Sequence, residues 1–435
     1  MDNLQELDRK NIWHPFTSLA SKEDPLLIES GEGIYLYTTN GRKIIDAVSS
    51  WWVNLHGHSH PQITKAIADQ AQTLEHVIFA GFTHRPAIQL SKNLLSITPK
   101  NQVKIFFSDN GSTAVEVALK MAFQFWFNQG IHNKKKVIAI RGAYHGDTFG
   151  SMSVGERGAF SAPFSNYLFN VEYIDFPTTE NEALVNNQFR ALLQQGDVGA
   201  FIYEPLVQAA AGMRMYSSHA LDSLLREARA HNVICVADEV FTGFGRTGRM
   251  FASDYLSNQP DIMALSKGLT GGAMAMGVTS CCEKIVNAFT SGETEKTFFH
   301  GHSYTANPMA CAAANASFSL LVGEECQRQI KFIEQQHLEF ATKIKLTSPD
   351  HIVRCIGTIL AIELHTKDTS SYFNEIRKKI LPYFLEKNIL LRPLGNVIYV
   401  LPPYIIQKNE LREIYQCIES FLLEIKDQSP EPASD

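Results

Sequence analysis

The sequence has no apolar run long enough to cross a lipid bilayer, and its first residues lack the apolar core of a signal peptide. It also lacks an excess of positive charge, because 39 lysines and arginines are outnumbered by 45 acidic residues. We therefore do not expect a membrane or a nucleic acid as a partner. The seven cysteines lack the paired spacings of a zinc site or a disulfide framework. Such cysteines fit a reducing compartment, and we expect a cytoplasmic protein.

Two kinds of binding site are also missing from the pattern. The glycine-rich turns contain neither the dinucleotide fingerprint nor the lysine pattern of a phosphate loop, so a nucleotide site is not expected. Three histidines at alternate positions, His56, His58 and His60, have no carboxylate or cysteine at a metal-ligand spacing. We expect structural roles for them and no metal.

The sequence does have the composition of a compact globular protein, with 45% hydrophobic and 10% aromatic residues. In its central part, short apolar runs alternate with helical segments. This alternation predicts an α/β fold with a mostly parallel sheet covered by helices on both faces. The expected strands are residues 104–107, 137–140, 200–203, 233–237, 262–265 and 277–282.

Both ends of the chain differ from this central part. Residues 32–37 and 43–48 are expected to form two strands joined by an Asn–Gly turn. From about residue 323, charged helices and short strands indicate an α+β lobe. The expected bounds are 49–309 for a large domain, 1–48 and 310–426 for a small domain built from both ends, and 427–435 for a disordered tail.

Two opposite charges follow apolar runs that we expect to be neighbouring strands. Asp238 ends one run, and Lys267 comes just after another. Pyridoxal phosphate catalysis needs such a pair, because a lysine binds the cofactor as a Schiff base and an acid pairs with the pyridinium nitrogen. The alternative is a solvated lysine and an ordinary helix start. The glycines after Lys267, which let backbone approach a bound group, favour the cofactor.

A possible phosphate site lies at the helix expected to open at Ser112. Gly111 allows close approach, and the free N–H groups of a first helical turn attract an anion. Thr113 and Glu116 are expected to contribute a capping box there. Tyr144, at a strand end among glycines, could either stack on a flat ring or cap the core.

Aromatic and cationic residues outline a possible substrate pocket. Trp51 and Trp52 are adjacent and cannot both face one side of a regular element, so at least one should line a cleft or an interface. Arg392 lies within apolar sequence, where a guanidinium needs a carboxylate. That carboxylate is either a structural Asp or Glu or part of a bound ligand, and a cofactor site elsewhere in the chain favours the ligand.

Together these segments resemble the class III pyridoxal phosphate-dependent aminotransferases of fold type I, over nearly the whole chain. DEVFTGFGRTG around Asp238 and LSKGLTGG around Lys267 carry this resemblance. Further segments resemble the members of this family that make 7,8-diaminononanoate from 8-amino-7-oxononanoate in biotin biosynthesis. These segments are WHPFT, SSWW, FFSDNGSTAVEVALKMA, YHGDTFGSMSV, EPLVQAAAGMRMY and RPLGNVIYVLPPY.

The resemblance implies roles for the residues of a cofactor site. Lys267 would hold the cofactor and then act as general base, and Asp238 would keep the pyridine nitrogen protonated. Tyr144 would cover the ring face, and Gly111 and Ser112 would bind the phosphate. The resemblance also implies a homodimer with shared active sites, in which Ser303 completes the phosphate site of the partner subunit.

For the substrate, the resemblance implies that Arg392 binds the carboxylate of 8-amino-7-oxononanoate. Trp51 and Tyr144 would line the pocket, with Lys267 and Gly301 as further substrate contacts. The reaction would be ping-pong, because donor and acceptor use one pocket in turn.

The amino donor is the part of the function that the resemblance leaves open. Phe16 in WHPFT and His302 in HGHSYTANP depart from the pattern of adenosylmethionine-using members and are similar to relatives that use lysine. SSWW and GMRMY are similar to the adenosylmethionine type, and we expect S-adenosylmethionine as donor. The alternatives are lysine as donor, another class III ω-aminotransferase, and a non-catalytic module that kept the fold.

Overall fold

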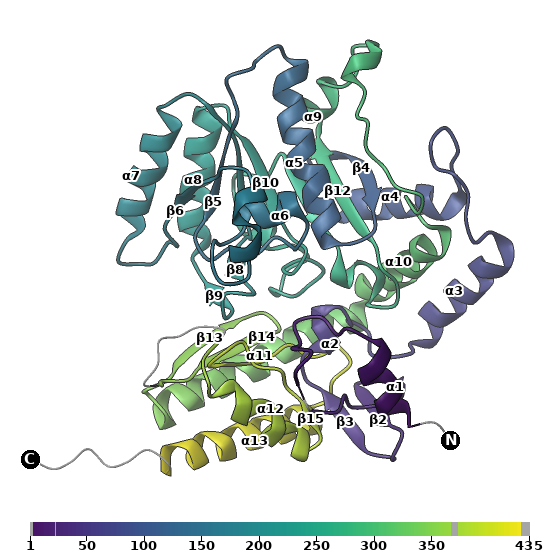
Figure 1. Cartoon of the computed structure of the whole chain (residues 1–435), viewed down its shortest axis with the longest axis vertical. Coiled ribbons are helices and arrows are strands. Elements are labelled where there is room, and N and C mark those ends of the chain that lie inside the picture. The colour runs from purple at the N-terminus through teal and green to yellow at the C-terminus, as the bar shows by residue number, and fades with distance from the viewer. Residues whose placement is uncertain (1–2, 22, 367–372, 428–435) are drawn as a thin grey trace, which may run out of the picture.

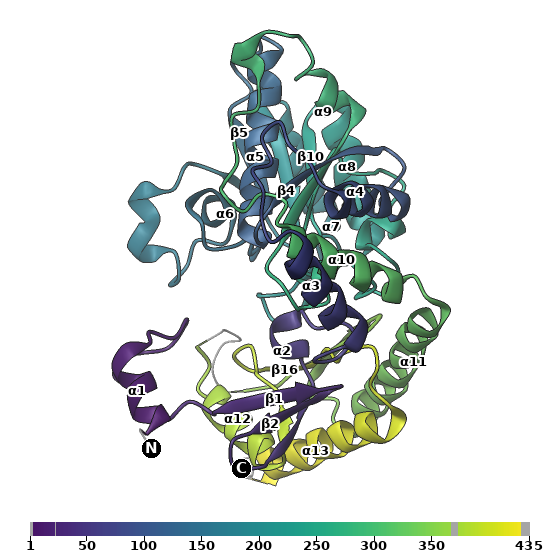
Figure 2. The same cartoon turned by 90° about the vertical axis from the view of Figure 1, so that its right-hand side faces the viewer.

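The computed structural model describes residues 3–21, 23–366 and 373–427, so most of the expected tail lies outside the described residues. Figures 1 and 2 show two parts, one built around a large sheet and one that contains both the first and the last elements of the chain. None of the helices in the described ranges has the length and apolarity needed to cross a membrane.

The large sheet has seven strands and is mostly parallel. Its order is β4 (Gln102–Ser108), β12 (Gly277–Cys282), β11 (Ile262–Leu265), β10 (Ile234–Asp238), β7 (Val198–Tyr203), β5 (Lys136–Ile140) and β6 (Glu172–Ile174). Strand β12 is antiparallel to both of its neighbours, while β10 is parallel to β11 and β7. The six expected central strands are all present, and the expected α/β class is confirmed.

Helices cover both faces of this sheet, so its central strands are buried. In β10, Ile234 and Val236 belong to one apolar cluster and Cys235 and Ala237 to another, because successive side chains point to opposite faces. Helix α5 (Gly111–Asn128) contributes to the first cluster and α8 (Ser218–Ala230) to the second. This burial explains why the strands read as continuous apolar runs.

The second part contains two smaller sheets. One has the order β1 (Ile28–Glu32), β2 (Tyr35–Thr38), β3 (Lys43–Asp46) and β15 (Ile389–Leu390), and the other has the order β13 (Ile352–Ile356), β14 (Ile359–Glu363) and β16 (Val397–Val400). Strand β15 pairs in parallel with β3, so the two ends of the chain share one sheet, as expected. The carboxyl-terminal helices of this part are α11 (Glu324–Thr347), α12 (Arg377–Glu386) and α13 (Lys408–Asp427).

Further helices, turns and a short strand pair complete the two parts. The helices are α1 (Leu4–Asn11), α2 (Ser49–Trp52), α3 (Pro61–Thr73), α4 (Arg85–Ile97), α6 (Phe149–Val154), α7 (Glu182–Leu193), α9 (Glu283–Asn287) and α10 (Pro308–Leu321). The 3-10 turns are η1 (Ala162–Tyr167), η2 (Ala252–Tyr255), η3 (Lys267–Thr270) and η4 (Thr294–Lys296), and β8 (Val207–Gln208) pairs with β9 (Arg214–Met215).

The amino-terminal strands differ from the expectation. The strand expected at residues 32–37 begins at Tyr35, because Gly33 has a positive φ of 58° and turns the chain there. Strand β1 was not expected at all. Its side chains are mostly exposed, so the alternation that signals a half-buried strand is absent from its sequence.

The start of α5 also differs from the expectation. Asn110 is the N-cap, and it forms the capping box with Thr113: the Asn110 Oδ1 accepts from the Thr113 N–H at 3.0 Å, and the Asn110 N–H donates to the Thr113 Oγ1 at 3.1 Å. The predicted role of Glu116 in this capping box is therefore wrong. Its carboxylate instead accepts from the Gly150 and Ser151 N–H groups of α6.

Candidate active site

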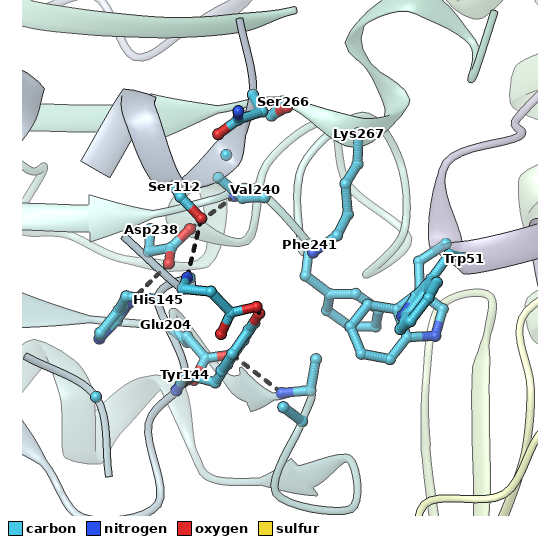
Figure 3. A pocket seen from close by; sticks show the side chains of 18 of the residues that line it. Trp51, Ser112, Tyr144, His145, Glu204, Asp238, Val240, Phe241, Ser266 and Lys267 are labelled. Atoms are coloured by element: carbon cyan, nitrogen blue, oxygen red, sulfur yellow. Dashed lines mark hydrogen bonds and ion pairs between the residues drawn. The ribbon is translucent and has the colours of Figure 1, made fainter. Parts of the chain in front are cut away.

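A cavity of about 990 Å³ lies at the carboxyl ends of the central parallel strands. The predicted residues that line it are Trp51, Gly111, Ser112, Tyr144, Asp238 and Lys267. Figure 3 shows several of these side chains around the open space, with Lys267 extended into it. Residues from five separate segments of the chain therefore meet here.

Asp238 lies at the end of β10, is buried, and is held on both carboxylate oxygens. Its Oδ1 accepts from the Val240 N–H at 3.0 Å, and its Oδ2 lies 2.7 Å from the Nδ1 of His145. His145 is itself buried, and its Nε2 has no hydrogen-bond partner among the described residues. The carboxylate is thus fixed in one orientation at the cavity wall (Figure 3).

Lys267 follows β11 and begins the turn η3 with a positive φ of 47°. Strands β10 and β11 are adjacent and parallel, which brings Lys267 and Asp238 to the same edge of the sheet. The Lys267 Nζ lies 4.9 Å from the ring centroid of Trp52 and 5.8 Å from that of Phe241. Burial lowers the pKa of Lys267, while the charges of Asp238 and Glu204 oppose this shift. A lowered pKa favours the neutral amine, which is the nucleophilic form.

Glu204 is a third charged residue at a strand end, and no role in the site was predicted for it from the sequence. It follows β7, and its carboxylate accepts from the Tyr144 N–H at 3.0 Å and the Ala209 N–H at 3.1 Å. Burial raises the pKa of Glu204 to about 7. The signal that could have found it is the one that found Asp238, a carboxylate directly after an apolar strand.

Tyr144 and Ser112 line the cavity from two segments that Asp147 connects. The Tyr144 hydroxyl donates to the Asp147 Oδ2 at 3.0 Å, and the Asp147 N–H donates to the Ser112 Oγ at 3.2 Å. Burial raises the pKa of Tyr144, so its hydroxyl stays protonated as a donor. A Cβ at Gly111 would lie 2.7 Å from the Val240 Cγ1, so only glycine lets α5 begin this close to the strand end.

Trp51 and Trp52 diverge because the backbone around them is irregular, with positive φ at Ser49, Ser50 and Trp52. The Trp52 side chain is buried and its Nε1–H donates to the Tyr399 hydroxyl at 2.9 Å. Trp51 is 42% exposed and faces the cavity. The expectation that at least one of the pair lines a cleft is confirmed.

Arg392 is not among the residues that line the cavity, but its guanidinium lies 4.9 Å from the ring centroid of Trp51, which lines it. It forms no ion pair within the part of the chain that the structure describes, so the structural carboxylate considered above has no candidate there. Phe16 packs against Trp51 at 5.7 Å between ring centroids and against Phe160 at 6.3 Å. The cavity mouth is therefore aromatic, with a cation next to it.

Other predicted residues lie outside this cavity. Gly301 and Ser303 are exposed in the loop before α10, as a contribution to another subunit requires, and their roles stay predictions. Two of the three alternate histidines have side-chain partners: His56 lies 3.1 Å from the Ser317 Oγ, and His58 bridges Asn54 and Asp46. His60 caps α3.

The site fits a flat, phosphorylated, basic heterocycle. An acid and an amine lie at adjacent strand ends, a tyrosine lines the same cavity, and the amino-terminal turn of α5 opens on the same space. The unpartnered Nε2 of buried His145 adds a polar atom that the described residues leave unsatisfied. The lysine and the acid are the groups that pyridoxal phosphate requires.

Comparisons with known proteins agree with this reading. The family model "Aminotransferase class-III" matches residues 18–422. An adenosylmethionine-8-amino-7-oxononanoate aminotransferase from Synechococcus elongatus is 48% identical over 427 residues, which cover 95% of this chain and 99% of that relative.

Two solved structures confirm the fold. The adenosylmethionine-8-amino-7-oxononanoate aminotransferase from Methanocaldococcus jannaschii is 36% identical, with a TM-score of 0.90 and coverage of 96% of this chain and 98% of that one. An amine transaminase from an uncultivated Pseudomonas species, solved in the PLP-bound (internal aldimine) form, is 27% identical, with a TM-score of 0.88 and coverage of 95% and 98%. The chain therefore belongs to the class III aminotransferase family.

Proposed function

We propose that this aminotransferase uses pyridoxal phosphate to convert 8-amino-7-oxononanoate to 7,8-diaminononanoate, a step of biotin biosynthesis, with S-adenosylmethionine as amino donor. The observation that carries the proposal is the meeting of Asp238 and Lys267 at adjacent strand ends in one large cavity. The 48% identity to the Synechococcus elongatus relative supports the acceptor.

When bound, pyridoxal phosphate supplies an electron sink and carries the amino group from donor to acceptor. Lys267 would hold it and, as a neutral amine, would move the proton between the substrate carbon and the cofactor carbon that exchange the amino group. Asp238, fixed by Val240 and His145, keeps the proton on the pyridine nitrogen. Tyr144 covers the ring, and Gly111 and Ser112 hold the phosphate at the start of α5.

The acceptor is a long, mostly apolar chain that ends in a carboxylate. Trp51, Phe16 and Phe160 present aromatic surface at the cavity mouth, and Arg392 offers a guanidinium that has no carboxylate partner among the described residues. An aromatic wall followed by a bidentate cation suits such a molecule. Gly301 and Ser303 complete the site from the partner subunit of a cytoplasmic homodimer.

The amino donor is tested by adding S-adenosylmethionine or lysine separately to the holoenzyme. We expect S-adenosylmethionine to convert the absorption spectrum to that of the pyridoxamine form, and 8-amino-7-oxononanoate to reverse the change. Conversion by lysine alone would show that lysine is the donor, as in the relatives whose sequences are similar at Phe16 and His302. Amination of the keto acid partner of 4-aminobutyrate, with no reaction of 8-amino-7-oxononanoate, would overturn the acceptor.

A further inference from the structure

Glu116 lies in the second turn of α5, outside the cavity, and binds the start of another helix. Its Oε1 accepts from the Gly150 N–H at 2.7 Å, the Ser151 N–H at 3.1 Å and the Thr148 hydroxyl at 2.5 Å. Thr148 is the N-cap residue of α6, yet its own side chain makes no capping hydrogen bond. Glu116 therefore does from a neighbouring helix what an N-cap side chain does locally.

The segment that α6 anchors is part of the cavity wall. Tyr144, Asp147 and Thr148 precede α6 directly, and all three line the cavity. This segment is joined to α5 a second time, because the Asp147 N–H donates to the Ser112 Oγ and the Ser151 hydroxyl donates to the Ser112 carbonyl at 2.8 Å. The Tyr144 hydroxyl in turn donates to Asp147.

Contact between the two helices leaves little free space. A Cβ at Gly150 would lie 2.1 Å from the Glu116 Oε2, and a Cβ at Gly146 would lie 2.0 Å from the Ser112 Oγ. Two glycines thus let the segment rest directly on α5. The position of the segment relative to Ser112 depends on the three hydrogen bonds of Glu116 at one end and on the Ser112 contacts at the other.

We propose that Glu116 is a positioning residue for the cofactor site. Its carboxylate sets the start of α6, and through it the place of the Tyr144 ring and of the Ser112 hydroxyl. Hydrogen bonds to an ionised carboxylate are about twice as strong as neutral ones, so one side chain can hold three donors. The inference rests on the proposed function, because it assigns Tyr144 and Ser112 to pyridoxal phosphate.

The test compares Glu116→Ala and Glu116→Gln with a matched control, Glu410→Ala. Glu410 is also half-buried, its carboxylate accepts from the Tyr35 hydroxyl at 2.6 Å and the Gln407 N–H at 2.7 Å, and none of these three residues lines the cavity. Three quantities are measured for each variant. They are the dissociation constant for pyridoxal phosphate when it is added to the cofactor-free protein, the hydrogen exchange of residues 144–148, and the unfolding temperature.

We expect Glu116→Ala to raise the dissociation constant by about tenfold or more and to speed exchange in residues 144–148, because three donors lose their acceptor. Glu116→Gln keeps an acceptor but not the charge, and a rise of about two- to fivefold is expected. Glu410→Ala should lower the unfolding temperature and leave the dissociation constant and the exchange unchanged. Gly150→Ala, which displaces the carboxylate from the other side, should weaken cofactor binding in the same direction.

Unchanged cofactor affinity and unchanged exchange in both Glu116→Ala and Gly150→Ala would overturn the inference and leave Glu116 a stabilising contact only. If the unaltered protein does not bind pyridoxal phosphate, the proposed function fails instead. The exchange of residues 144–148 still decides whether Glu116 orders the segment. If Glu116→Ala does not fold, the same two measurements on the isosteric Glu116→Gln and on Gly150→Ala decide the test.

Discussion

The apolar surroundings of the Lys267 amine change its pKa. Burial lowers its pKa below the ordinary 10.5, so folding disfavours the protonated form. Below the lowered pKa, both the folded and the unfolded chain carry the proton, and the folded state bears the full cost of burying the charge. As the pH rises from that pKa toward 10.5, the unfolded chain binds more protons than the folded one, and the contribution of Lys267 to stability rises.

We therefore expect the cofactor-free Lys267→Met variant to be more stable than the unaltered protein at neutral pH, by a margin that shrinks as the pH approaches 10.5. Urea unfolding at a series of pH values measures this margin. Arg141→Met serves as the control, since Arg141 pairs with Asp175 on the surface and is absent from the cavity. A margin independent of pH would show that the amine is not desolvated. Lys267→Met should also have no transamination activity.

Arg392 is expected to contribute to the binding of 8-amino-7-oxononanoate and not to the proton transfer steps. Replacing Arg392 by Met removes a cation that faces a bound carboxylate, which costs about 2 kcal/mol or more, or about a 30-fold rise in KM for 8-amino-7-oxononanoate. Steady-state kinetics with the acid and with its methyl ester check this. We expect the ester to react equally well with both proteins, and an equal loss for acid and ester would contradict the carboxylate contact.

The central residues of the site could be predicted from local sequence, but their partners could not. Asp238 and Lys267 each follow an apolar run, and such a run places its last residue at a strand end. His145 and the Asp238 carboxylate are 93 residues apart in sequence, and nothing near His145 indicates that they meet. Glu204 has a local signal like that of Asp238, but its contact with Tyr144 depends on how two distant segments pack.

Element boundaries depend on caps, and one cap gives a direct test. Asn110 closes the first turn of α5, whose amides line the cavity. Asn110→Ala is expected to lower the free energy of unfolding by about 1 kcal/mol, because the Thr113 N–H loses its acceptor. Denaturant unfolding measures it, and Asn110→Ser, another good N-cap, should recover most of the loss. Equal loss in both variants would mean that the side chain of Asn110 acts otherwise than as a cap.

Helix α5 also shows which features of an element could not be predicted from the sequence. The sequence predicted the start of α5 within one residue. It also predicted that Glu116 caps this same start, whereas Glu116 caps the start of α6. A capping box is a pattern of spacing, and the three-residue spacing from Thr113 to Glu116 is the same as the one from Asn110 to Thr113. Only the folded structure shows that Glu116 reaches α6. Strand β15, two residues long, was hidden for a similar reason, since it is defined by its pairing with β3.

For the whole molecule, the prediction that matters most concerns shared active sites. Lys267→Ala should be inactive, and Ser303→Asp should bind pyridoxal phosphate poorly, because its new charge would face the phosphate of the partner subunit's site. Mixed and allowed to exchange subunits, the two variants should regain about a quarter of the full activity. This is because half of the dimers are then mixed, and each mixed dimer contains one site with both Lys267 and Ser303.

The control for this experiment is each variant alone, carried through the same exchange. If Ser303 serves the cavity of its own chain, the mixture contains no complete site and stays inactive. The sequence of one chain could not settle this, because the exposed loop of Gly301 and Ser303 lies outside the cavity that the chain forms by itself.

The sheet that joins β3 to β15 has a consequence for synthesis. A ribosome releases the amino-terminal strands first, but the edge of β3 stays open until residue 389 has been made. An open strand edge is a template for pairing with other chains. Nascent polypeptides that terminate before this point should therefore aggregate through their beginnings, while those that terminate just after α13 should not.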